Sequence, residues 1–340
     1  KRGVAVAGTH GKTTTTSLTA SVLAEGELDP TFVIGGKLLA AGANARLGKG
    51  DWLVAEADES DGSFLRLNPA VAVITNIDAD HLENYGGDFE RVKQAFAEFL
   101  HRLPFYGLAV LCIDDDEVAQ LAHATPRHIV TYGFSHEADV RAADIQQQGA
   151  RMHFTLCLPD GSRTACTLAL PGRHNVQNAL AAAAIGWQLG VPNAAIARAF
   201  EKFEGIGRRF NQLATLALAE GGEVALVDDY GHHPKELAAV FAAARGGWPD
   251  KRLVVAFQPH RYSRTRDLFD EFAAVLSSVD ALVLTEVYPA GEAPIAGADA
   301  KSLARSIRTR GRVDPVVVSA ASELRTVLPG VLHDGDLLLL

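Results

Sequence analysis

The chain has 340 residues, of which 48% are hydrophobic and 21% are charged, and its formal net charge is −9. This composition is typical of a folded globular protein and excludes an intrinsically disordered chain. The acidic balance provides no broad basic surface, so we expect no nucleic-acid partner, although a local basic pocket for an anionic ligand stays open. The length is sufficient for two or more domains, each with its own core.

The cysteines and the hydropathy pattern indicate where the protein works. The cysteines are Cys112, Cys157 and Cys166, an odd number without metal-ligand spacing, which favours a reducing compartment. No apolar run reaches the roughly 20 residues of a membrane span, and the first residues lack the layout of a signal peptide. We therefore expect a cytoplasmic protein without membrane insertion. The sequence does not indicate an oligomeric state.

Neither end of the sequence resembles the end of a complete protein. Residue 1 is not Met, and the predicted strand Val4–Ala7 begins almost at once. The last residues, Leu337–Leu340, are typical of a buried strand, which in a parallel sheet is followed by a crossover. We therefore expect the chain to be part of a longer protein.

The first part of the chain alternates short apolar runs with amphipathic stretches. The apolar runs predict strands buried on both faces, at Val4–Ala7, Trp52–Ala55, Val71–Ile77 and Leu108–Cys112. Apolar residues at helical spacing predict helices at Thr13–Ala24 and Phe89–Leu100. Strands that alternate with helices indicate a parallel α/β sheet.

A small antiparallel patch is predicted next. Its strands are Asp139–Ile145, His153–Leu158 and Thr164–Leu170, and the turn residues Pro159–Ser162 join the last two. Two alanine-rich helices follow, around Val176–Leu189 and Ala194–Phe203.

Beyond a predicted hinge at Gly205–Gly207, the α/β alternation resumes. Strands are predicted at Val224–Val227, Leu253–Phe257, Ala281–Leu284 and Pro315–Val318. Helices are predicted between them at Pro234–Arg245, Arg266–Leu276 and Ala300–Arg308. This pattern indicates a second, Rossmann-like α/β domain, so we predict domains at residues 1–206 and 207–340.

A candidate phosphate-binding loop lies between the first strand and the first helix. It consists of Gly8, Thr9, His10, Gly11, Lys12, Thr13 and Thr14. In such a loop the backbone N–H groups and the helix N-terminus face the anion, the Lys reaches the β- and γ-phosphates, and a hydroxyl binds Mg²⁺. Val6 stands where the longer motif has Gly, so the match is to the shorter Gly-x-x-Gly-Lys-Thr form. The alternative is a tight turn with a solvated Lys, which the strand-loop-helix context disfavours.

Acidic residues and a histidine follow the next two strands. Glu56 is the first residue after Trp52–Ala55 and is well placed to reach a Mg²⁺ held by ATP phosphates. The same acidic stretch contains Glu59 and Asp61, for which we expect a solvated loop. His81 follows the strand that begins at Val71, and beside a phosphate loop a metal ligand is favoured over a structural histidine.

Together with further motifs along the chain, these residues resemble the Mur ligases. The motifs that carry the resemblance keep the family's order and spacing: Gly-Thr-His-Gly-Lys-Thr-Thr (8–14), Glu-Ala-Asp-Glu-Ser-Asp (56–61), Thr-Asn-Ile-Asp-Ala-Asp-His (75–81), Gly-Arg-His-Asn-Val-Gln-Asn (172–178), Gly-Arg-Arg-Phe (207–210), Asp-Asp-Tyr-Gly-His-His-Pro (228–234), Phe-Gln-Pro-His-Arg-Tyr-Ser-Arg-Thr (257–265) and Glu-Val-Tyr-Pro-Ala-Gly-Glu (286–292). The resemblance implies a central ATPase domain followed by an amino-acid-binding domain. The family's N-terminal UDP-binding domain and its extreme C-terminus have no counterpart in these residues.

The resemblance also implies an activity and its substrates. The likeness is greatest to the members that join L-alanine to UDP-N-acetylmuramate in peptidoglycan synthesis, through an acyl phosphate made from ATP. Lys12 would then contact the β- and γ-phosphates, and Thr13 and Glu56 would hold Mg²⁺. His81 would hold a second Mg²⁺ near the acyl phosphate.

Further roles are implied for residues in both domains. Asn175, in the loop before the helix Val176–Leu189, would contact adenine with support from Asn178. Arg209 and Asp229 would reach the nucleotide when the domains close. The residues that would line the place where alanine meets the activated carboxylate are Tyr230, His232, His260, Arg261 and Arg264.

Other functions stay open on the sequence. A murein tripeptide recycling ligase would share the phosphate loop but differ around the acidic and Asp-x-Asp-His segments. A non-catalytic P-loop nucleotide-binding module, or a folylpolyglutamate-type ligase, would not require the histidines and arginines at 230–232 and 260–264.

Overall fold

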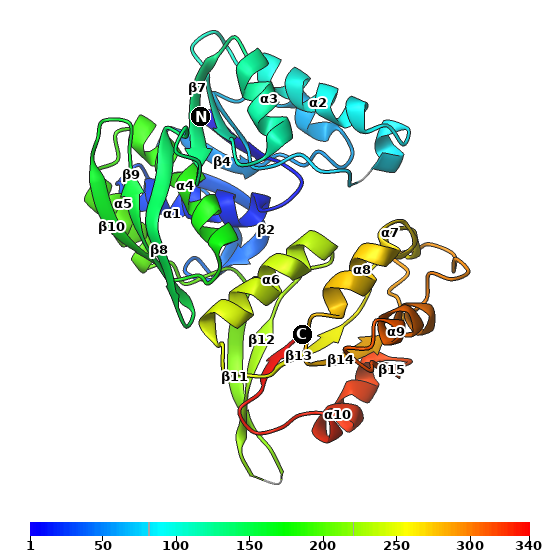
Figure 1. Cartoon of the computed structure of the whole chain (residues 1–340). Coiled ribbons are helices and arrows are strands. Elements are labelled where there is room, and N and C mark those ends of the chain that lie inside the picture. The colour runs from blue at the N-terminus through cyan, green and yellow to red at the C-terminus, as the bar shows by residue number, and fades with distance from the viewer. Residues whose placement is uncertain (81, 220) are drawn as a thin grey trace. The chain divides into compact units, whose positions relative to one another are not determined.

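The computed structural model describes residues 1–80, 82–219 and 221–340. The chain divides into two compact units, Lys1–Gly207 and Arg208–Leu340, which run from blue to green and from yellow-green to red in Figure 1. Each unit contains its own sheet. Among the described residues, no helix is both long and apolar enough to cross a membrane.

The first unit is built on one large sheet with the order β10-β9-β8-β7-β6-β5-β1-β4-β2-β3. Its strands are β1 (Arg2–Ala7), β2 (Thr31–Leu38), β3 (Ala43–Arg46), β4 (Trp52–Glu56), β5 (Val71–Ile74), β6 (Leu108–Cys112), β7 (His128–Gly133), β8 (Val140–Gln148), β9 (Arg151–Cys157) and β10 (Arg163–Leu168). Neighbours from β2 through β8 are parallel, whereas β9 and β10 continue the sheet antiparallel. The predicted parallel sheet with an antiparallel patch is thus confirmed.

The central strands are buried on both faces, because helices cover each side. In β1, Val4 and Val6 point into one core and Ala5 and Ala7 into the other. The helices of this unit are α1 (Lys12–Glu25), α2 (Phe89–His101), α3 (Asp116–Ala124), α4 (Arg173–Gln188) and α5 (Asn193–Glu201). Side chains of α1, α4 and α5 fill the first core, and those of α2 and α3 fill the second.

Helices α1 and α4 pack closely, and small residues permit it. A Cβ on Gly186 would lie 2.6 Å from a methyl group of Val22, so a larger residue at position 186 would push the two helices apart. Residues 179–184 of α4, which are alanines except for Leu180, are all fully buried. This packing sets the position of the start of α1, where the candidate phosphate loop ends.

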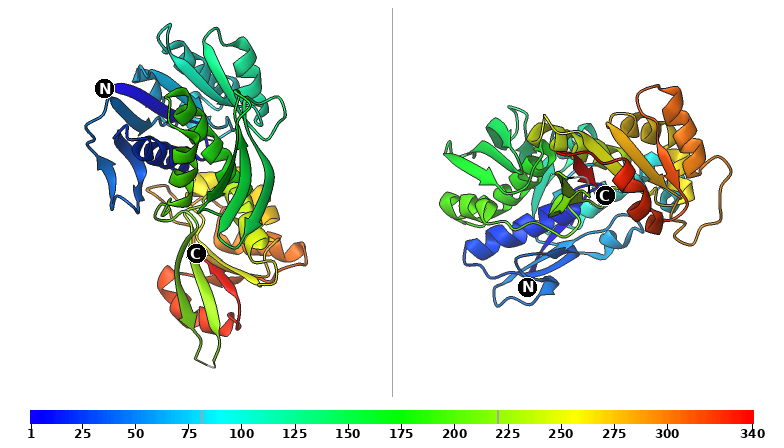
Figure 2. Two further views of the ribbon diagram at one scale, coloured as in Figure 1. Left: turned by 90° about the vertical axis from the view of Figure 1, so that its left-hand side faces the viewer. Right: turned by 90° about the horizontal axis from the view of Figure 1, so that it is seen from below.

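The second unit contains a sheet with the order β11-β12-β16-β13-β14-β15. Its strands are β11 (Asn211–Ala217), β12 (Glu223–Asp228), β13 (Leu253–Phe257), β14 (Ala281–Thr285), β15 (Val316–Val318) and β16 (Leu337–Leu339). All neighbours are parallel except β11 and β12, which form a hairpin that extends beyond the rest of the sheet (Figure 2). This is the second Rossmann-like domain that the sequence predicts.

Helices cover both faces of this second sheet as well. They are α6 (Pro234–Gly247), α7 (Tyr262–Asp267), α8 (Phe269–Leu276), α9 (Ala300–Thr309) and α10 (Leu324–Val327). Side chains of α6, α8 and α9 form the larger core, and α10 packs on the opposite face.

Three sequence-based expectations about the elements were wrong or incomplete. α4 begins at Arg173 rather than Val176, so Asn175 belongs to the helix and not to the loop before it. The predicted helix Arg266–Leu276 is two helices separated at Leu268. Several elements were not predicted, namely β2, β3, α3, β7, β11 and α10.

Candidate active site

The loop between β1 and α1 is held by residues that follow β5. The backbone N–H of His10 donates to Asn76 Oδ1 at 2.8 Å, and Thr75 Oγ1 donates to the His10 carbonyl at 2.6 Å. The N–H of Asp78 donates to Thr9 Oγ1 at 2.9 Å. Since β1 and β5 are neighbours, this mutual bracing fixes the path of the loop at the carboxyl edge of the sheet.

Two glycines give the loop its shape. Gly8 has φ 127°, and a Cβ at this position would overlap Thr75 Oγ1. Gly11 has φ 81° at the N-cap of α1, where a Cβ would lie 2.6 Å from Asn178 Oδ1. Only glycine adopts both conformations at little cost, so the backbone N–H groups at the start of α1 stay accessible to an anion.

Lys12 contacts a buried carboxylate that the sequence did not single out. Its ammonium donates to Glu59 at 2.8 and 3.0 Å and to the Gly8 carbonyl at 2.7 Å. Glu59 is 3% exposed, so the expectation that it belongs to a solvated loop was wrong, whereas Asp61 is exposed as expected. Burial raises the pKa of Glu59, and the charge of Lys12 opposes this rise. Residues 56–61 contain four carboxylates, and the sequence does not indicate which of them is buried. Because neighbouring carboxylates repel one another, the stretch did indicate that a cation lies close to it.

Thr13 and Glu56 form a second pair beside Lys12. Thr13 Oγ1 donates to Glu56 Oε2 at 3.2 Å, and Glu56 Oε1 accepts from the N–H of Gly35 at 2.6 Å. The pairing of β1 with β4 places Val6 opposite Glu56, which brings the carboxylate to the loop. Hydroxyl and carboxylate oxygens are the hard ligands that Mg²⁺ prefers, so the donor set fits this ion. Thr14 is buried one residue further along α1, and His81 lies outside the described residues.

The two asparagines of α4 are buried against the phosphate loop and its helix. Asn178 Oδ1 accepts from Thr15 Oγ1 at 3.2 Å, and Asn178 Nδ2 donates to Asn175 Oδ1 at 3.3 Å. Asn175 Nδ2 donates to the Pro171 carbonyl at 2.7 Å. Asn178 therefore supports the start of α1, and the adenine contact of Asn175 stays a prediction.

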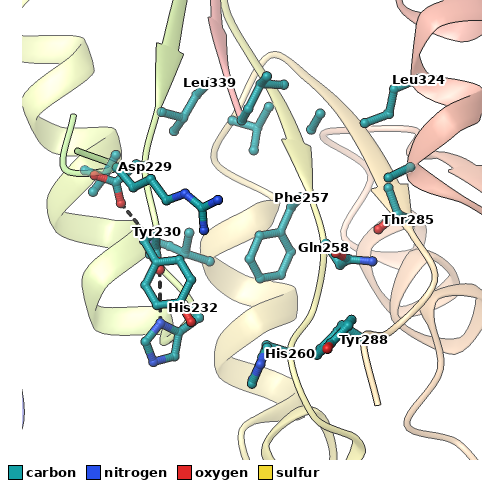
Figure 3. Close-up of a pocket in the computed structure, with 18 residues that line it drawn as sticks. Asp229, Tyr230, His232, Phe257, Gln258, His260, Thr285, Tyr288, Leu324 and Leu339 are labelled. Carbon is teal, nitrogen blue, oxygen red and sulfur yellow. Dashed lines mark hydrogen bonds between the residues drawn. The ribbon is translucent and has the colours of Figure 1, made fainter. Parts of the chain in front are cut away.

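The second unit carries a pocket of about 320 Å³ at the carboxyl edge of its sheet. Its wall consists of Arg208, Asp229, Tyr230, Gly231, His232, Leu237, Val240, Val255, Ala256, Phe257, Gln258, His260, Thr285, Tyr288, Ala321, Leu324, Leu339 and Leu340. Figure 3 shows His232 and His260 at one end and the apolar Leu324 and Leu339 at the other. The structure thus brings together four predicted site residues, including Asp229 and Tyr230, whereas Arg209, Arg261 and Arg264 are not part of this wall.

Aromatic rings line the polar end of the pocket. The ring centroids of His232 and His260 are 6.2 Å apart, and Tyr288 stacks on His260 at 5.4 Å. His232 Nδ1 lies 3.0 Å from the Tyr230 carbonyl, which accepts when that nitrogen carries the proton. Burial is the main reason that the pKa of His232 and of His260 is lowered, and the charge of Arg264 lowers both further. Both rings are therefore neutral at pH 7 and able to accept a proton.

Asp229 is half-buried and directly follows β12, next to Tyr230 in the chain. Its carboxylate accepts from the N–H groups of Phe210 at 2.8 Å and Gly231 at 2.7 Å. Burial raises the pKa of Asp229 to about 6 in spite of these bonds. The guanidinium carbon of Arg209 lies 5.9 Å from the centre of the Tyr230 ring. Asp229 thus holds the backbone at Gly231, between Tyr230 and His232.

The two predicted arginines lie on α7, directly after His260. Arg261 is the N-cap of this helix and has φ 71°, a value that is rare for a residue with a Cβ. Arg264 lies one turn later and is 9% exposed. The sequence did not single out Tyr288 and Glu292, which contact the start of this helix, although both belong to the motif at residues 286–292.

Comparison with known proteins agrees with this geometry. Residues 6–186 match the Mur ligase middle domain, and residues 208–340 match the domain described as "Mur ligase, glutamate ligase domain". The UDP-N-acetylmuramate–L-alanine ligase of Xanthomonas campestris pv. campestris (strain B100) is 76% identical over 340 residues, which are the whole of this chain and 71% of that protein.

Solved structures give the same result. The UDP-N-acetylmuramate–alanine ligase of Thermotoga maritima superposes with a TM-score of 0.81 at 30% identity, over 100% of this chain and 71% of that one. A murein peptide ligase from Psychrobacter arcticus has a TM-score of 0.69 at 22% identity, over 100% of this chain and 74% of that one, and shares the fold. On both domain matches and the 76% identity to the Xanthomonas campestris ligase, the chain belongs to the Mur ligase family.

Proposed function

We propose that this chain catalyses the ATP-dependent joining of L-alanine to UDP-N-acetylmuramate in peptidoglycan precursor synthesis. The observation that carries the proposal is the 76% identity over all 340 residues to a ligase with this name. The murein peptide ligase, in contrast, is 22% identical, so the recycling reaction is not favoured. A non-catalytic nucleotide-binding module would not account for the histidine-lined pocket of the second unit.

The first unit supplies the ATP site in this proposal. The phosphate loop from Gly8 to Thr14 would hold the β- and γ-phosphates through its backbone N–H groups and Lys12. Thr13 and Glu56 would hold Mg²⁺, which neutralises charge on the phosphate oxygens when it is bound. A second Mg²⁺ ligand at His81 and adenine contacts at Asn175 remain predictions within this proposal.

The reaction takes place in two steps. A carboxylate oxygen of UDP-N-acetylmuramate attacks the γ-phosphorus, the bond to the β-phosphate oxygen breaks, and an acyl phosphate and ADP result. The amine of L-alanine then attacks the acyl carbonyl, inorganic phosphate leaves with the bonding electrons, and the amine loses its proton. The protein contributes mainly positioning and charge neutralisation.

The second unit supplies the amino-acid site in this proposal. The guanidinium groups of Arg261 and Arg264 suit the carboxylate of alanine, because a guanidinium can bond both of its oxygens. The neutral rings of His232 and His260, with Tyr230 beside them, would surround the amine and accept its proton. Arg209 and Asp229 are predicted to contact the nucleotide.

The test is ADP release by the full-length protein in the presence of ATP, Mg²⁺ and UDP-N-acetylmuramate, with and without L-alanine. We expect ADP and the alanyl product to form in equal amounts and only when alanine is present. The same assay with a murein tripeptide in place of alanine distinguishes the recycling reaction. ADP release that does not depend on alanine, or product only with the tripeptide, would overturn the proposal.

A further inference from the structure

The segment from Glu286 to Glu292 lies along the residues that lead into α7. The N–H of Tyr288 donates to the Pro259 carbonyl at 2.8 Å, and the N–H of Arg261 donates to the Tyr288 carbonyl at 2.8 Å. These bonds form a parallel bridge between His260 and Tyr288, whose rings also stack. The segment therefore supports one of the pocket histidines and the first predicted arginine from the same side.

Glu292 completes this support at the first turn of α7. Its Oε2 accepts from the N–H of Ser263 at 2.9 Å, and its Oε1 accepts from Ser263 Oγ at 2.6 Å. Burial raises the pKa of Glu292, but the bonds from Ser263 and the charge of Arg261 outweigh it and leave this pKa below its ordinary value. The carboxylate is thus ionised at neutral pH and accepts both bonds at once.

The backbone that Glu292 holds is strained. Arg261 has φ 71° and ψ 135°, a conformation that a residue with a Cβ adopts only where its surroundings enforce it. The surroundings here are the Tyr288 carbonyl on the N–H of Arg261 and Thr265, whose hydroxyl donates to the Arg261 carbonyl at 2.8 Å. Ser263 lies between Arg261 and Thr265, so Glu292 fixes the middle of the strained turn.

We propose that Glu292 is a positioning residue of the amino-acid site, which acts through Ser263 to hold Arg261 and Arg264 where they bind the carboxylate of the incoming amino acid. This inference rests on the proposed function. Glu292 does not bind the substrate. It keeps the first turn of α7 in place, so its loss moves two guanidinium groups together and leaves the phosphate loop of the first unit unchanged.

The test compares Glu292→Ala with Glu292→Gln in the full-length protein, and Glu271→Ala, an exposed carboxylate on α8, is the matched control. In Glu292→Ala we expect KM for L-alanine to rise roughly 10-fold while KM for ATP stays within about twofold. Glu292→Gln should recover most of the loss, because its amide oxygen can accept from the Ser263 N–H and its amide nitrogen can donate to Ser263 Oγ. Glu271→Ala should behave as the wild type.

Two further measurements separate positioning from a general structural defect. Ser263→Ala alone should raise KM for L-alanine less than Glu292→Ala does, because it removes only the bond from the hydroxyl. The double variant should be no worse than Glu292→Ala, which already removes both bonds. Hydrogen–deuterium exchange should increase in the peptide 261–268 of Glu292→Ala and not in the peptides of α1.

The outcomes distinguish this inference from the proposed function. A wild-type protein that releases ADP without need for alanine overturns the proposed function and this inference with it. Alanine-dependent activity with an unchanged alanine KM in Glu292→Ala overturns the positioning role alone. The positioning role is also overturned if Glu292→Ala changes KM for alanine and KM for ATP equally, or if Glu292→Gln recovers none of the loss. Additive effects of Ser263→Ala and Glu292→Ala would contradict it as well.

Discussion

The ammonium of Lys12 lies 2.8 Å from an oxygen of Glu59, a carboxylate buried beneath the phosphate loop. The backbone carbonyl of Glu59 also accepts a hydrogen bond from the Tyr85 hydroxyl, which fixes the acidic residue from its other side. Burial by itself favours the neutral form of Glu59, and the positive charge of Lys12 favours the ionised form. The ionised carboxylate therefore depends on Lys12. Lys12, the residue proposed to bind phosphate, is therefore also the partner of a buried carboxylate.

The first prediction concerns the stability of this pair. Lys12→Met should lower the free energy of unfolding by about 3 kcal/mol at pH 7, because it leaves a buried carboxylate without its cation. The double variant Lys12→Met/Glu59→Gln should regain most of that loss, since no charge is then buried. Urea denaturation followed by circular dichroism measures both values. A double variant as unstable as the single one would show that the pair does not act as a unit.

The second prediction concerns nucleotide affinity. Lys12→Ala should weaken binding of a non-hydrolysable ATP analogue with Mg²⁺ by roughly 1.5–3 kcal/mol, the range for hydrogen bonds to charged groups. Lys49→Ala, which removes an exposed Lys of the same unit, serves as the control and should bind like the wild type. Isothermal titration calorimetry on the 340-residue chain gives both affinities. Equal affinities for the two variants would argue against a phosphate role for Lys12.

The third prediction concerns the proposed metal site. Glu56→Gln should raise the Mg²⁺ concentration for half-maximal ADP release by roughly 10-fold, because an amide is a weaker ligand than a carboxylate for a hard cation. Asp61→Asn changes an exposed carboxylate of the same loop and should leave the Mg²⁺ requirement unchanged. A Mg²⁺ titration at saturating ATP measures the difference. If both variants shift alike, the effect comes from loop charge and not from coordination.

The fourth prediction concerns the pocket histidines. The rings of His232 and His260 should titrate below about 6.5, the ordinary value for histidine, because burial and Arg264 both favour the neutral form. Since the folded-state pKa is lowered, the stability that the neutral rings contribute is present above about pH 6.5 and is lost as the pH falls below it.

Two arginine variants test the cause of this shift. Arg264→Gln should move the pKa of His260 upward, whereas Arg266→Gln, on the exposed side of the same helix, should not move it. Histidine ring resonances in a ¹H–¹⁵N NMR titration report each pKa directly. A His260 pKa above 6.5 in the wild type, or no change in Arg264→Gln, would contradict the electrostatic explanation.

Elements with a clear run or periodicity of apolar residues were predicted from the sequence, whereas elements without such a pattern were missed. Val4–Ala7 is a continuous apolar run, and the strand predicted there lies within β1. β11 is an edge strand with mostly exposed residues, so buried and exposed residues do not alternate along it and its sequence has no strand pattern. The start of α4 was misplaced because Gly172 at its N-cap offers no side-chain signal, and the apolar periodicity begins only at Val176.

Within the candidate site, residue types were predictable but environments were not. Glu56 was expected at the carboxyl edge of the sheet, and it is the last residue of β4, where it accepts a hydrogen bond from Thr13 Oγ1. The burial of Glu59 could not be read from a run of carboxylates, because it depends on Lys12 from a segment 47 residues away. Glu292 was quoted within a motif, yet its contact with Ser263 arises only when β13 and β14 pair.

β16 has a consequence for how the second unit forms during translation. This strand comes last among the strands of its sheet along the chain, yet it lies between β12 and β13 and pairs with both. Until residues 337–339 have emerged from the ribosome, β12 and β13 lack the neighbour that joins them, and two strand edges stay open to wrong partners. In the first unit, β1 comes first along the chain and both of its neighbours, β4 and β5, follow by residue 74. A nascent chain would thus complete the sheet that carries the candidate phosphate loop well before the sheet that carries the histidine-lined pocket, and slow synthesis near residue 330 would prolong the stage with open strand edges.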